Sequence, residues 1–302
     1  MFAPDRTQCC LGKAIQINEL GNAMTETPIS LRRALLSGLL GVTLAGCSSL
    51  PAQPAASASP ARVDTAERRA RATANALDAW VERVAMLPLA ASIRQRVQGS
   101  EPDARVIEYL AAILDEVPSR DVYGVYIAFE DKKWTDPLSM PWVDRKSWPK
   151  GTVVSYDYHD PKQDWYNGPK RSGALHITEP YFDEGGSDIT MVSVTRPVKD
   201  RNGRFIGVAG ADISLQDIDT RLQSSDRDTF LVSKGGIVIG HPEARFMPRK
   251  GYPGEKLTNL PAGQTIAARE SGSTQVMVDG SLRTYVWQTA PVTGWRVVVS
   301  LP

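Results

Sequence analysis

The hydrophobic pattern of the chain changes its period at Pro118. Before this proline, apolar side chains recur every three or four residues, which places them on one face of an α-helix. The two stripes are Leu77, Trp80, Val81 and Val84, and then Val106, Tyr109, Leu110, Ile113, Leu114 and Val117. Beyond the proline, apolar residues alternate with others, as in β-strands. The sequence therefore predicts an α+β fold in which helices come first and strands follow.

The first helix has predicted limits. Asp64 or Thr65 can cap its amino terminus, and it is expected to run towards Met86. Pro88 should kink or end it, because proline has no N–H and its ring clashes with the preceding turn. The second stripe should then form a separate helix that starts near Ser100, which resembles the beginning of a capping box.

The alternating segments predict two groups of strands. The first group is Val122–Phe129, Val153–Tyr156, Ile189–Val198 and Arg204–Ile213, and the second is Thr229–Ser233, Ile237–Gly240, Gly272–Val278, Leu282–Gln288 and Trp295–Ser300. Asn202-Gly203 and Asp279-Gly280 favour tight turns between antiparallel strands. Trp142 lies among prolines and is expected in an ordered loop. We therefore expect two successive antiparallel units.

Charge and cysteine content exclude several classes of function. The 302 residues have a formal net charge of +1, which is not typical of a protein that binds nucleic acid. All three cysteines lie within the first 47 residues, so the remainder must be stabilised by its core rather than by disulfides. His159, His176 and His241 lack metal-ligand spacing, and no nucleophile motif occurs. We therefore expect no metal, no cofactor and no enzymatic activity.

The amino-terminal segment has the pattern of a secretory signal. Arg32 and Arg33 precede a short apolar run that ends in small residues, and the run is too short to span a membrane comfortably. Its end, Leu44–Cys47, resembles the bacterial lipobox, which implies a lipid on Cys47. Ser48 follows, and in that resemblance a residue other than aspartate favours the outer membrane over the inner membrane.

These features divide the first part of the chain. Residues 1–46 are predicted to be a signal peptide, of which 1–23 resemble an over-extended gene start before Met24. Residues 47–62 are rich in Pro, Ala and Ser and are predicted to be a lipid-anchored flexible linker. The expected location is the periplasmic side of the outer membrane.

Aromatic rings and carboxylates alternate between Tyr156 and Asp212. Ring faces attract cations, and carboxylates form charge-assisted hydrogen bonds with them. Each of these rings by itself is more typical of a hydrophobic core. Together they indicate a pocket for a small cation.

Several segments of the folded part resemble the double Cache family, the extracellular sensors of bacterial chemoreceptors and histidine kinases. They are Thr195–Val198, Val208–Ser214, Leu231–Pro242 and Gly294–Val299. The resemblance covers about residues 63–302 and implies two PAS-like modules with antiparallel sheets behind a long helix. It assigns 63–225 to the helices and a membrane-distal, ligand-binding module, and 226–302 to a membrane-proximal module.

A subset of that family binds amino acids through a motif that this chain resembles in part. The matching positions are Tyr158, Trp165, Tyr166, Tyr181, Asp183 and Asp212. In the resemblance the rings cover the ligand and Asp212 takes its ammonium group. Asp164 is a further candidate acid. The family's carboxylate-binding arginine is replaced by Gln163, which offers only a neutral dipole.

This replacement leaves alternatives for the ligand. The resemblance implies a small cationic amine, or an α-amino acid if Lys162, Lys170 or Arg171 supplies the missing cation. The module would act through a separate membrane-bound signalling protein or a transporter. A structural or interaction module without a ligand is the competing interpretation, and Gln163 favours it.

Overall fold

The computed structural model describes residues 58–99, 105–131, 140–151, 154, 156–223 and 228–302, all within one compact unit, Ala52–Pro302. The predicted signal peptide, Cys47 and most of the predicted linker lie outside the described residues. So does the predicted boundary between residues 225 and 226, and the division into two domains stays a prediction. In the described part of the chain, no helix combines the length and the apolar character needed to cross a membrane.

The first helix, α1, spans Pro60–Gln98 and is longer at both ends than the sequence predicted. It begins before the expected caps, with Pro60 in its first turn, where a missing N–H costs nothing. It also continues through Pro88, so the predicted break is wrong. Val84 and Ala91, on either side of the proline, are buried. Packing along the helix therefore outweighs the loss of one backbone hydrogen bond.

The first sheet is antiparallel and has the strand order β2-β1-β6-β5-β3, with β4 also paired to β5. Its strands are β1 (Gly124–Phe129), β2 (Trp142–Asp144), β3 (His176–Ile177), β4 (Tyr181–Phe182), β5 (Thr190–Lys199) and β6 (Phe205–Ser214). The helices α2 (Val106–Asp115) and α3 (Asp164–Ser172) contact this sheet. β5 and β6 confirm the predicted strands and the turn at Asn202-Gly203, whereas Trp142 belongs to β2 rather than to a loop.

The second sheet is also antiparallel and has the order β8-β7-β11-β10-β9. It follows α4 (Leu215–Gln223) and consists of β7 (Thr229–Val232), β8 (Val238–Gly240), β9 (Ser271–Val278), β10 (Ser281–Thr289) and β11 (Arg296–Leu301). The connection from β8 to β9 contains the 3-10 helices η1 (Ala244–Phe246) and η2 (Leu257–Asn259) and the short helix α5 (Gly263–Ala267). Asp279 and Gly280 both have positive φ, as expected for a tight hairpin turn.

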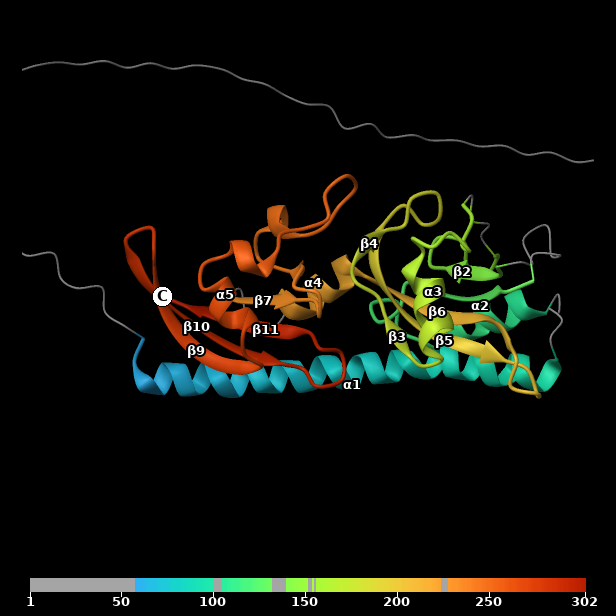
Figure 1. Ribbon diagram of the computed structural model, residues 1–302, viewed down its shortest axis with the longest axis horizontal. Helices are drawn as coiled ribbons and strands as arrows, with labels where there is room; N and C mark the ends of the chain where they lie inside the picture. The colour runs from blue at the N-terminus through green and yellow to red at the C-terminus, as the bar shows by residue number, and fades with distance from the viewer. Residues whose placement is uncertain (1–57, 100–104, 132–139, 152–153, 155, 224–227) are drawn as a thin grey trace, which may run out of the picture. The chain divides into compact units, whose positions relative to one another are not determined.

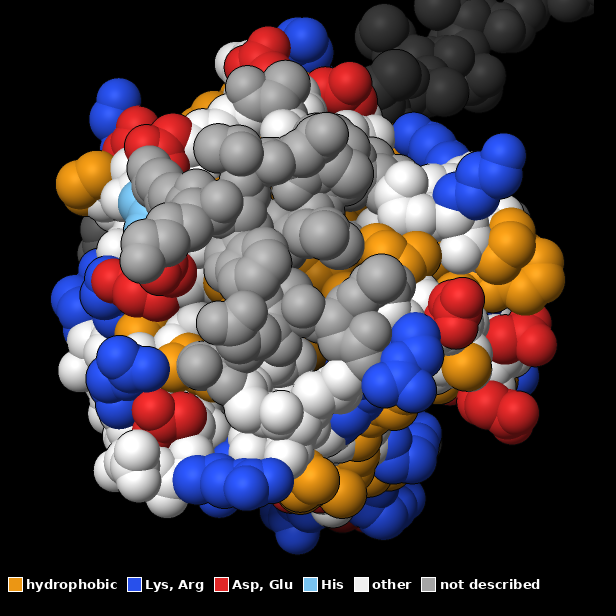
Figure 2. Space-filling view, turned by 90° about the vertical axis from the view of Figure 1, so that its right-hand side faces the viewer, with side chains coloured by type: hydrophobic (Ala, Val, Ile, Leu, Met, Phe, Trp, Pro, Cys, Tyr) orange, Lys and Arg blue, Asp and Glu red, His pale blue; other side chains and the backbone are white. Residues whose placement is uncertain are grey.

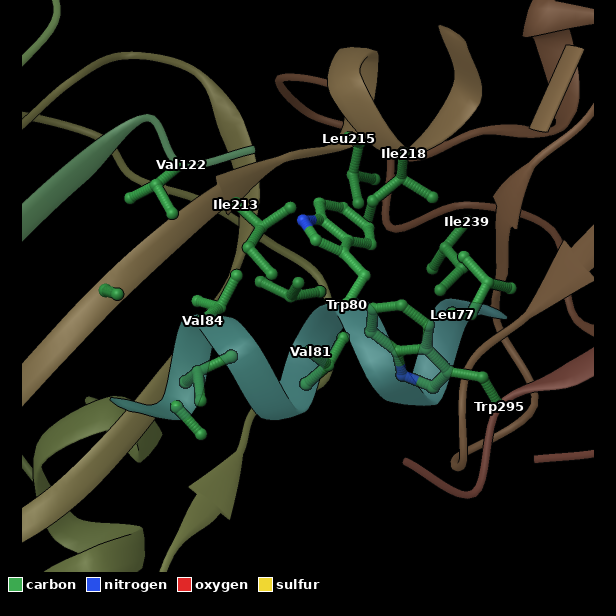
Figure 3. Packing of buried hydrophobic residues seen from close by; sticks show 14 of the residues in the cluster. Leu77, Trp80, Val81, Val84, Val122, Ile213, Leu215, Ile218, Ile239 and Trp295 are labelled. Carbon is green, nitrogen blue, oxygen red and sulfur yellow. The ribbon is translucent and has the colours of Figure 1, made fainter. Parts of the chain in front are cut away.

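α1 runs along both sheets (Figure 1). One hydrophobic core joins this helix to them. Trp80 of α1 is 1% exposed and lies against Leu215 and Ile218 (Figure 3). Ile239 of β8 and Trp295, which precedes β11, belong to the same cluster. A long helix behind two antiparallel sheets confirms the predicted α+β, double Cache fold. The continuous core explains why α1 stays helical throughout.

A buried carboxylate fastens α1 to the second sheet. Asp78 is 5% exposed and accepts hydrogen bonds from the backbone N–H groups of Val292 and Thr293, both at 2.9 Å, and from the Thr293 hydroxyl at 2.8 Å. Three donors surround one carboxylate, so this acid positions the turn between β10 and β11.

Glu179 connects the first sheet to the second. It lies between β3 and β4, and its carboxylate accepts hydrogen bonds from the Ser233 hydroxyl and, at 2.7 Å, from the Gly235 N–H in the β7–β8 turn. A Cβ on Gly235 would lie 2.6 Å from Cδ of Glu179, so only glycine fits there without displacement. The loop that leads into β4 is therefore tied to the second sheet.

Candidate ligand-binding site

A pocket lies on the face of the first sheet that carries α3. Its lining is Tyr126, Met140, Trp142, Tyr156, Trp165, Tyr181, Asp183 and Asp212. These side chains come from β1, β2, β4, β6 and α3 and from the loops beside them. They enclose about 10 Å³, about the room that one water molecule needs. A larger ligand therefore requires some of the side chains to move apart.

Strand register brings the floor of the pocket together. Tyr126 of β1 lies opposite Gly210 of β6, and its ring lies so close that a Cβ on Gly210 would be 2.1 Å from the ring's Cζ. Asp212 is two residues beyond Gly210, so its side chain points to the same face of the sheet. Trp142 of β2 is the other neighbour of Tyr126. Because Gly210 has no side chain, the Tyr126 ring can lie over it, next to the Asp212 carboxyl group.

Asp212 is the most deeply buried acid of the pocket, with 3% exposure. Its Oδ1 accepts a hydrogen bond of 2.6 Å from the hydroxyl of Ser193, which lies opposite it in the sheet. The Tyr181 hydroxyl lies 2.7 Å from the same Ser193 oxygen. Burial raises the pKa of Asp212 well above its ordinary value, and the bond from Ser193 opposes this only in part. The buried carboxyl therefore favours its protonated form until a cation approaches.

Asp183 is held in a fixed orientation. Its Oδ1 accepts a hydrogen bond from the Tyr156 hydroxyl at 2.9 Å, and its Oδ2 accepts from the backbone N–H and the hydroxyl of Ser187, at 2.7 and 2.9 Å. Burial, followed by the nearby Asp183 charge, raises the pKa of Tyr156. The tyrosine therefore stays a neutral donor to this carboxylate.

Two buried hydrogen-bond donors in the lining form no hydrogen bond of good geometry among the described residues. They are Nε1 of Trp142, which faces Asp212, and the Tyr126 hydroxyl, which faces Ser193. The Trp142 and Tyr126 side chains are 1% and 2% exposed. A buried donor without an acceptor costs about 1–3 kcal/mol. Both groups are therefore available to donate to a ligand or to a newly ionised Asp212.

The structure brings half of the eight sequence-predicted site residues into the lining. These four are Trp165, Tyr181, Asp183 and Asp212. Tyr158 and Tyr166 lie in the neighbouring aromatic cluster, where Tyr158 packs against Trp165 with ring centroids 6.1 Å apart. The Tyr158 hydroxyl donates to the carbonyl of Phe129 at 2.8 Å. These two rings support the pocket wall, and the ligand contacts of all eight residues stay a prediction.

Gln163 and Asp164 make other contacts at the start of α3. Oε1 of Gln163 accepts a hydrogen bond of 3.0 Å from Nε1 of Trp165, so this residue orients a ring that lines the pocket. The Asp164 carboxylate pairs with Arg171 at 3.1 Å and with His176 at 2.6 Å. Asp164 therefore has local partners outside the lining.

The proposed substitutes for the missing arginine lie outside the pocket lining. Nζ of Lys170 pairs with Oε1 of Glu130 at 2.6 Å, and Arg171 pairs with Asp164. Lys162 is not part of the lining either. In the described lining, two carboxyl groups therefore face no basic side chain.

Four lining residues are not among the predicted site residues: Tyr126, Met140, Trp142 and Tyr156. Gly124, Tyr126 and Ala128 are two residues apart along β1, so their side chains lie on the same face of the strand. Counting in steps of two could therefore have placed Tyr126 between two small residues. Trp142 could not be found in this way, because its position depends on the pairing of β2 with β1.

Comparison with known proteins finds sequence similarity to a sensor family over part of the chain. Residues 107–220 match the family described as methyl-accepting chemotaxis protein-like, first PDC sensor domain. The chain is 33% identical over 104 residues to the methyl-accepting chemotaxis protein PscA of Pseudomonas syringae pv. tomato, and 31% identical over 154 residues to McpA of Pseudomonas putida. The alignments cover 32% and 47% of this chain and 16% and 22% of the two receptors. The chain thus matches less than a quarter of the length of these relatives.

Solved structures give the same fold. Methyl-accepting Chemotaxis protein X is similar with a TM-score of 0.63 at 24% identity, over 80% of this chain and 98% of that chain. The ligand-binding domain of the Pseudomonas fluorescens chemoreceptor CtaA in complex with L-serine is similar with a TM-score of 0.58 at 22% identity. This match covers 80% of this chain and 97% of that chain. The ligand-binding domain of the Pseudomonas aeruginosa PAO1 chemoreceptor PctB in complex with L-Arg is similar with a TM-score of 0.57 at 19% identity. This match covers 80% of this chain and 87% of that chain.

These comparisons correct the predicted location. A lipid-anchored protein on the periplasmic side of the outer membrane was expected from the segment before Cys47 and from Ser48. The relatives are instead methyl-accepting chemotaxis receptors, whose sensor domains stand outside the inner membrane, and the three that match are not outer-membrane lipoproteins. The prediction of the outer membrane is therefore wrong, because a short motif around one cysteine was given more weight than the folded domain.

The family match, the two antiparallel sheets and the solved relatives agree on a sensor fold. Residues 107–220 thus match the model of the methyl-accepting chemotaxis protein-like PDC sensor family, within a chain that has the double Cache fold.

Proposed function

We propose that this sensor domain binds a small amine-containing ligand in the pocket between β1, β6 and α3. The observation that carries the proposal is the lining itself, in which Asp183 and Asp212 lie among aromatic rings with no basic side chain. An ammonium group fits this chemistry, since it can donate to both carboxylates while the rings contact its charge.

The buried state of Asp212 also favours a cation. Its pKa is raised by burial, and a bound ammonium group would lower it again by stabilising the ionised form. Binding at neutral pH would therefore release a proton to solvent. An α-amino acid brings a carboxylate as well, and burying that group without a cationic partner costs several kcal/mol.

The ligands of two structural relatives fit the amine part of this proposal. CtaA was solved with L-serine and PctB with L-Arg, and both molecules carry an ammonium group. The chain described here differs by Gln163 at the position where the resembled motif has an arginine. We therefore assign it an amine rather than a zwitterion, and its signal would pass to a membrane-bound signalling protein.

A second function is favoured by the size of the pocket. The enclosed space of about 10 Å³ and the tight aromatic lining suit a module that has lost its ligand and serves structure or interaction. The two functions differ in their response to a ligand, because only a sensor is stabilised when its ligand is added.

The test is a thermal-shift screen, followed by calorimetry, of L-amino acids, each beside its decarboxylated amine. L-serine with ethanolamine and L-arginine with agmatine are two such pairs. A ligand at 100 times its Kd stabilises the fold by about 2.7 kcal/mol, which corresponds to about 5–10 °C for a chain of this size. Amines should give the larger shift. If no compound shifts the melting temperature, the ligand-free module is the correct description.

A further inference from the structure

A second, separate groove lies between α1 and the end of β5. Its lining is Leu89, Ser92, Ile93 and Arg96 of α1, Gly173 and Ala174 after α3, and Arg196, Pro197 and Lys199 of β5. Side chains alternate along a strand, so Arg196 shares a face with Val192 and Val194, which belong to the core around α1. Ser193, which holds the pocket carboxylate, is on the other face. The groove is therefore distinct from the amine pocket.

All charged side chains of the groove are basic. Arg96, Arg196 and Lys199 line it together, and no Asp or Glu does. The register of β5 against β6 shifts between Val198 and Lys199. Such an irregularity breaks the strict alternation of the strand, and Lys199 thereby reaches the same groove as Arg196. Among the described residues, these three cations form no ion pair.

Arg196 supplies the observation that points to a ligand. Its Nε is buried and has no hydrogen-bond partner in the described part of the chain. Buried polar atoms in folded proteins almost always have a partner, so an orphaned donor of a charged group calls for an acceptor from outside the chain. A guanidinium matches planar oxyanions such as carboxylates and phosphates, which accept two of its hydrogen bonds.

The groove also has an apolar wall and a suitable size. Leu89, Ile93 and Pro197 contribute it, and Ile93 is 51% exposed. The space is about 280 Å³, close to the lower limit of about 300–1,000 Å³ that is usual for small-molecule sites. An inorganic ion would leave this apolar wall uncovered.

We propose that this groove binds a small organic anion. Its carboxylate or phosphate group lies between Arg96, Arg196 and Lys199, and its apolar part covers Ile93. Figure 2 shows the end of the molecule where α1 finishes, and Lys and Arg side chains gather along the lower margin of this face. A bound anion would bridge α1 and β5, the helix and a central strand of the sensor sheet.

The experiment measures binding of benzoate and of phenyl phosphate to the full chain by calorimetry at low salt, with benzyl alcohol as the neutral counterpart. At least one anion should bind saturably and more weakly as NaCl is added, while benzyl alcohol should not bind. Comparison of the two anions separates a carboxylate from a phosphate preference. Absence of saturable binding by both, or equal binding of benzyl alcohol, overturns the proposal.

Variants test the location of the anion. Arg196→Gln and Lys199→Gln should each weaken binding of the tighter anion at least tenfold. Arg201→Gln is the matched control, because this neighbouring arginine donates to the carbonyl of Val97 and does not line the groove. If Arg201→Gln weakens binding as much as Arg196→Gln, the attraction is diffuse and no built site exists. Lys199→Gln keeps the test valid if the arginine variant does not fold.

Discussion

Replacement of Asp212 by asparagine should change how stability depends on pH. Asp212 is buried, and its pKa is raised above the ordinary value. In the unfolded chain, an aspartate has a pKa of about 3.9. Between that value and the raised value of the folded protein, the native state holds one proton more than the unfolded state. Stability contributed by the neutral carboxyl is therefore lost as the pH rises through this window.

The size of the effect follows from linkage. One extra proton in the native state lowers the free energy of unfolding by up to about 1.4 kcal/mol for each pH unit in the window. Asp212→Asn removes the titrating group but keeps an oxygen that can accept the bond from the Ser193 hydroxyl. The variant should therefore be more stable than the wild type at pH 7, by an amount that grows as the pH rises from about 4.

Urea denaturation at several pH values between 4 and 8 measures this difference. The control is Asp164→Asn, in which a partly exposed acid paired with Arg171 and His176 is removed at the edge of the site. The control should keep the wild-type contribution of Asp212 to the pH profile. If the free energies of Asp212→Asn and the wild type differ by the same amount at every pH, Asp212 is not a buried neutral acid and the electrostatic account of the pocket fails.

Three other variants test the pocket and its link to the second sheet. Gly210→Ala should destabilise the fold by about 1–3 kcal/mol through overpacking, because the new Cβ would meet the Tyr126 ring; an unchanged melting temperature would contradict this register. Glu179→Gln should cost about 0.5–1.5 kcal/mol and speed hydrogen exchange of the Gly235 amide; unchanged exchange would show that the contact between the sheets is dispensable. Trp165→Ala should weaken amine binding by about 0.5–2 kcal/mol beyond lost packing, measured by calorimetry, and equal affinities would place the ligand elsewhere.

Much of the fold could be predicted from periodicity alone. β5 and β6 were predictable because the alternating apolar residues of both segments and the Asn202-Gly203 turn between them indicate the same antiparallel hairpin. Local rules failed at Pro88, where the cost of a proline is small beside the burial of α1 against two sheets. Such burial is a property of the assembled fold, which a local pattern does not contain.

The site was predictable only where its residues belong to a motif or a strand face. Trp165 and Asp212 occupy motif positions and line the pocket. Trp142 lies far from the motif in sequence and reaches the lining through the pairing of β2 with β1. Asp164 was an equally good candidate by composition, but its carboxylate pairs instead with His176, which lies 12 residues further along the chain. Ion pairs of this kind depend on tertiary contacts.

The central claim is that the pocket prefers an amine because Gln163 stands where an arginine would hold a carboxylate. The direct test is calorimetry of the best amine and its parent amino acid on the wild type and on Gln163→Arg, side by side. The wild type should bind the amine more tightly. Gln163→Arg should reverse the order, since a guanidinium attracts the carboxylate and repels a ligand that is only cationic. A wild type that prefers the amino acid would contradict the claim, and the Tyr126 hydroxyl and Trp142 Nε1 would then be the donors to examine.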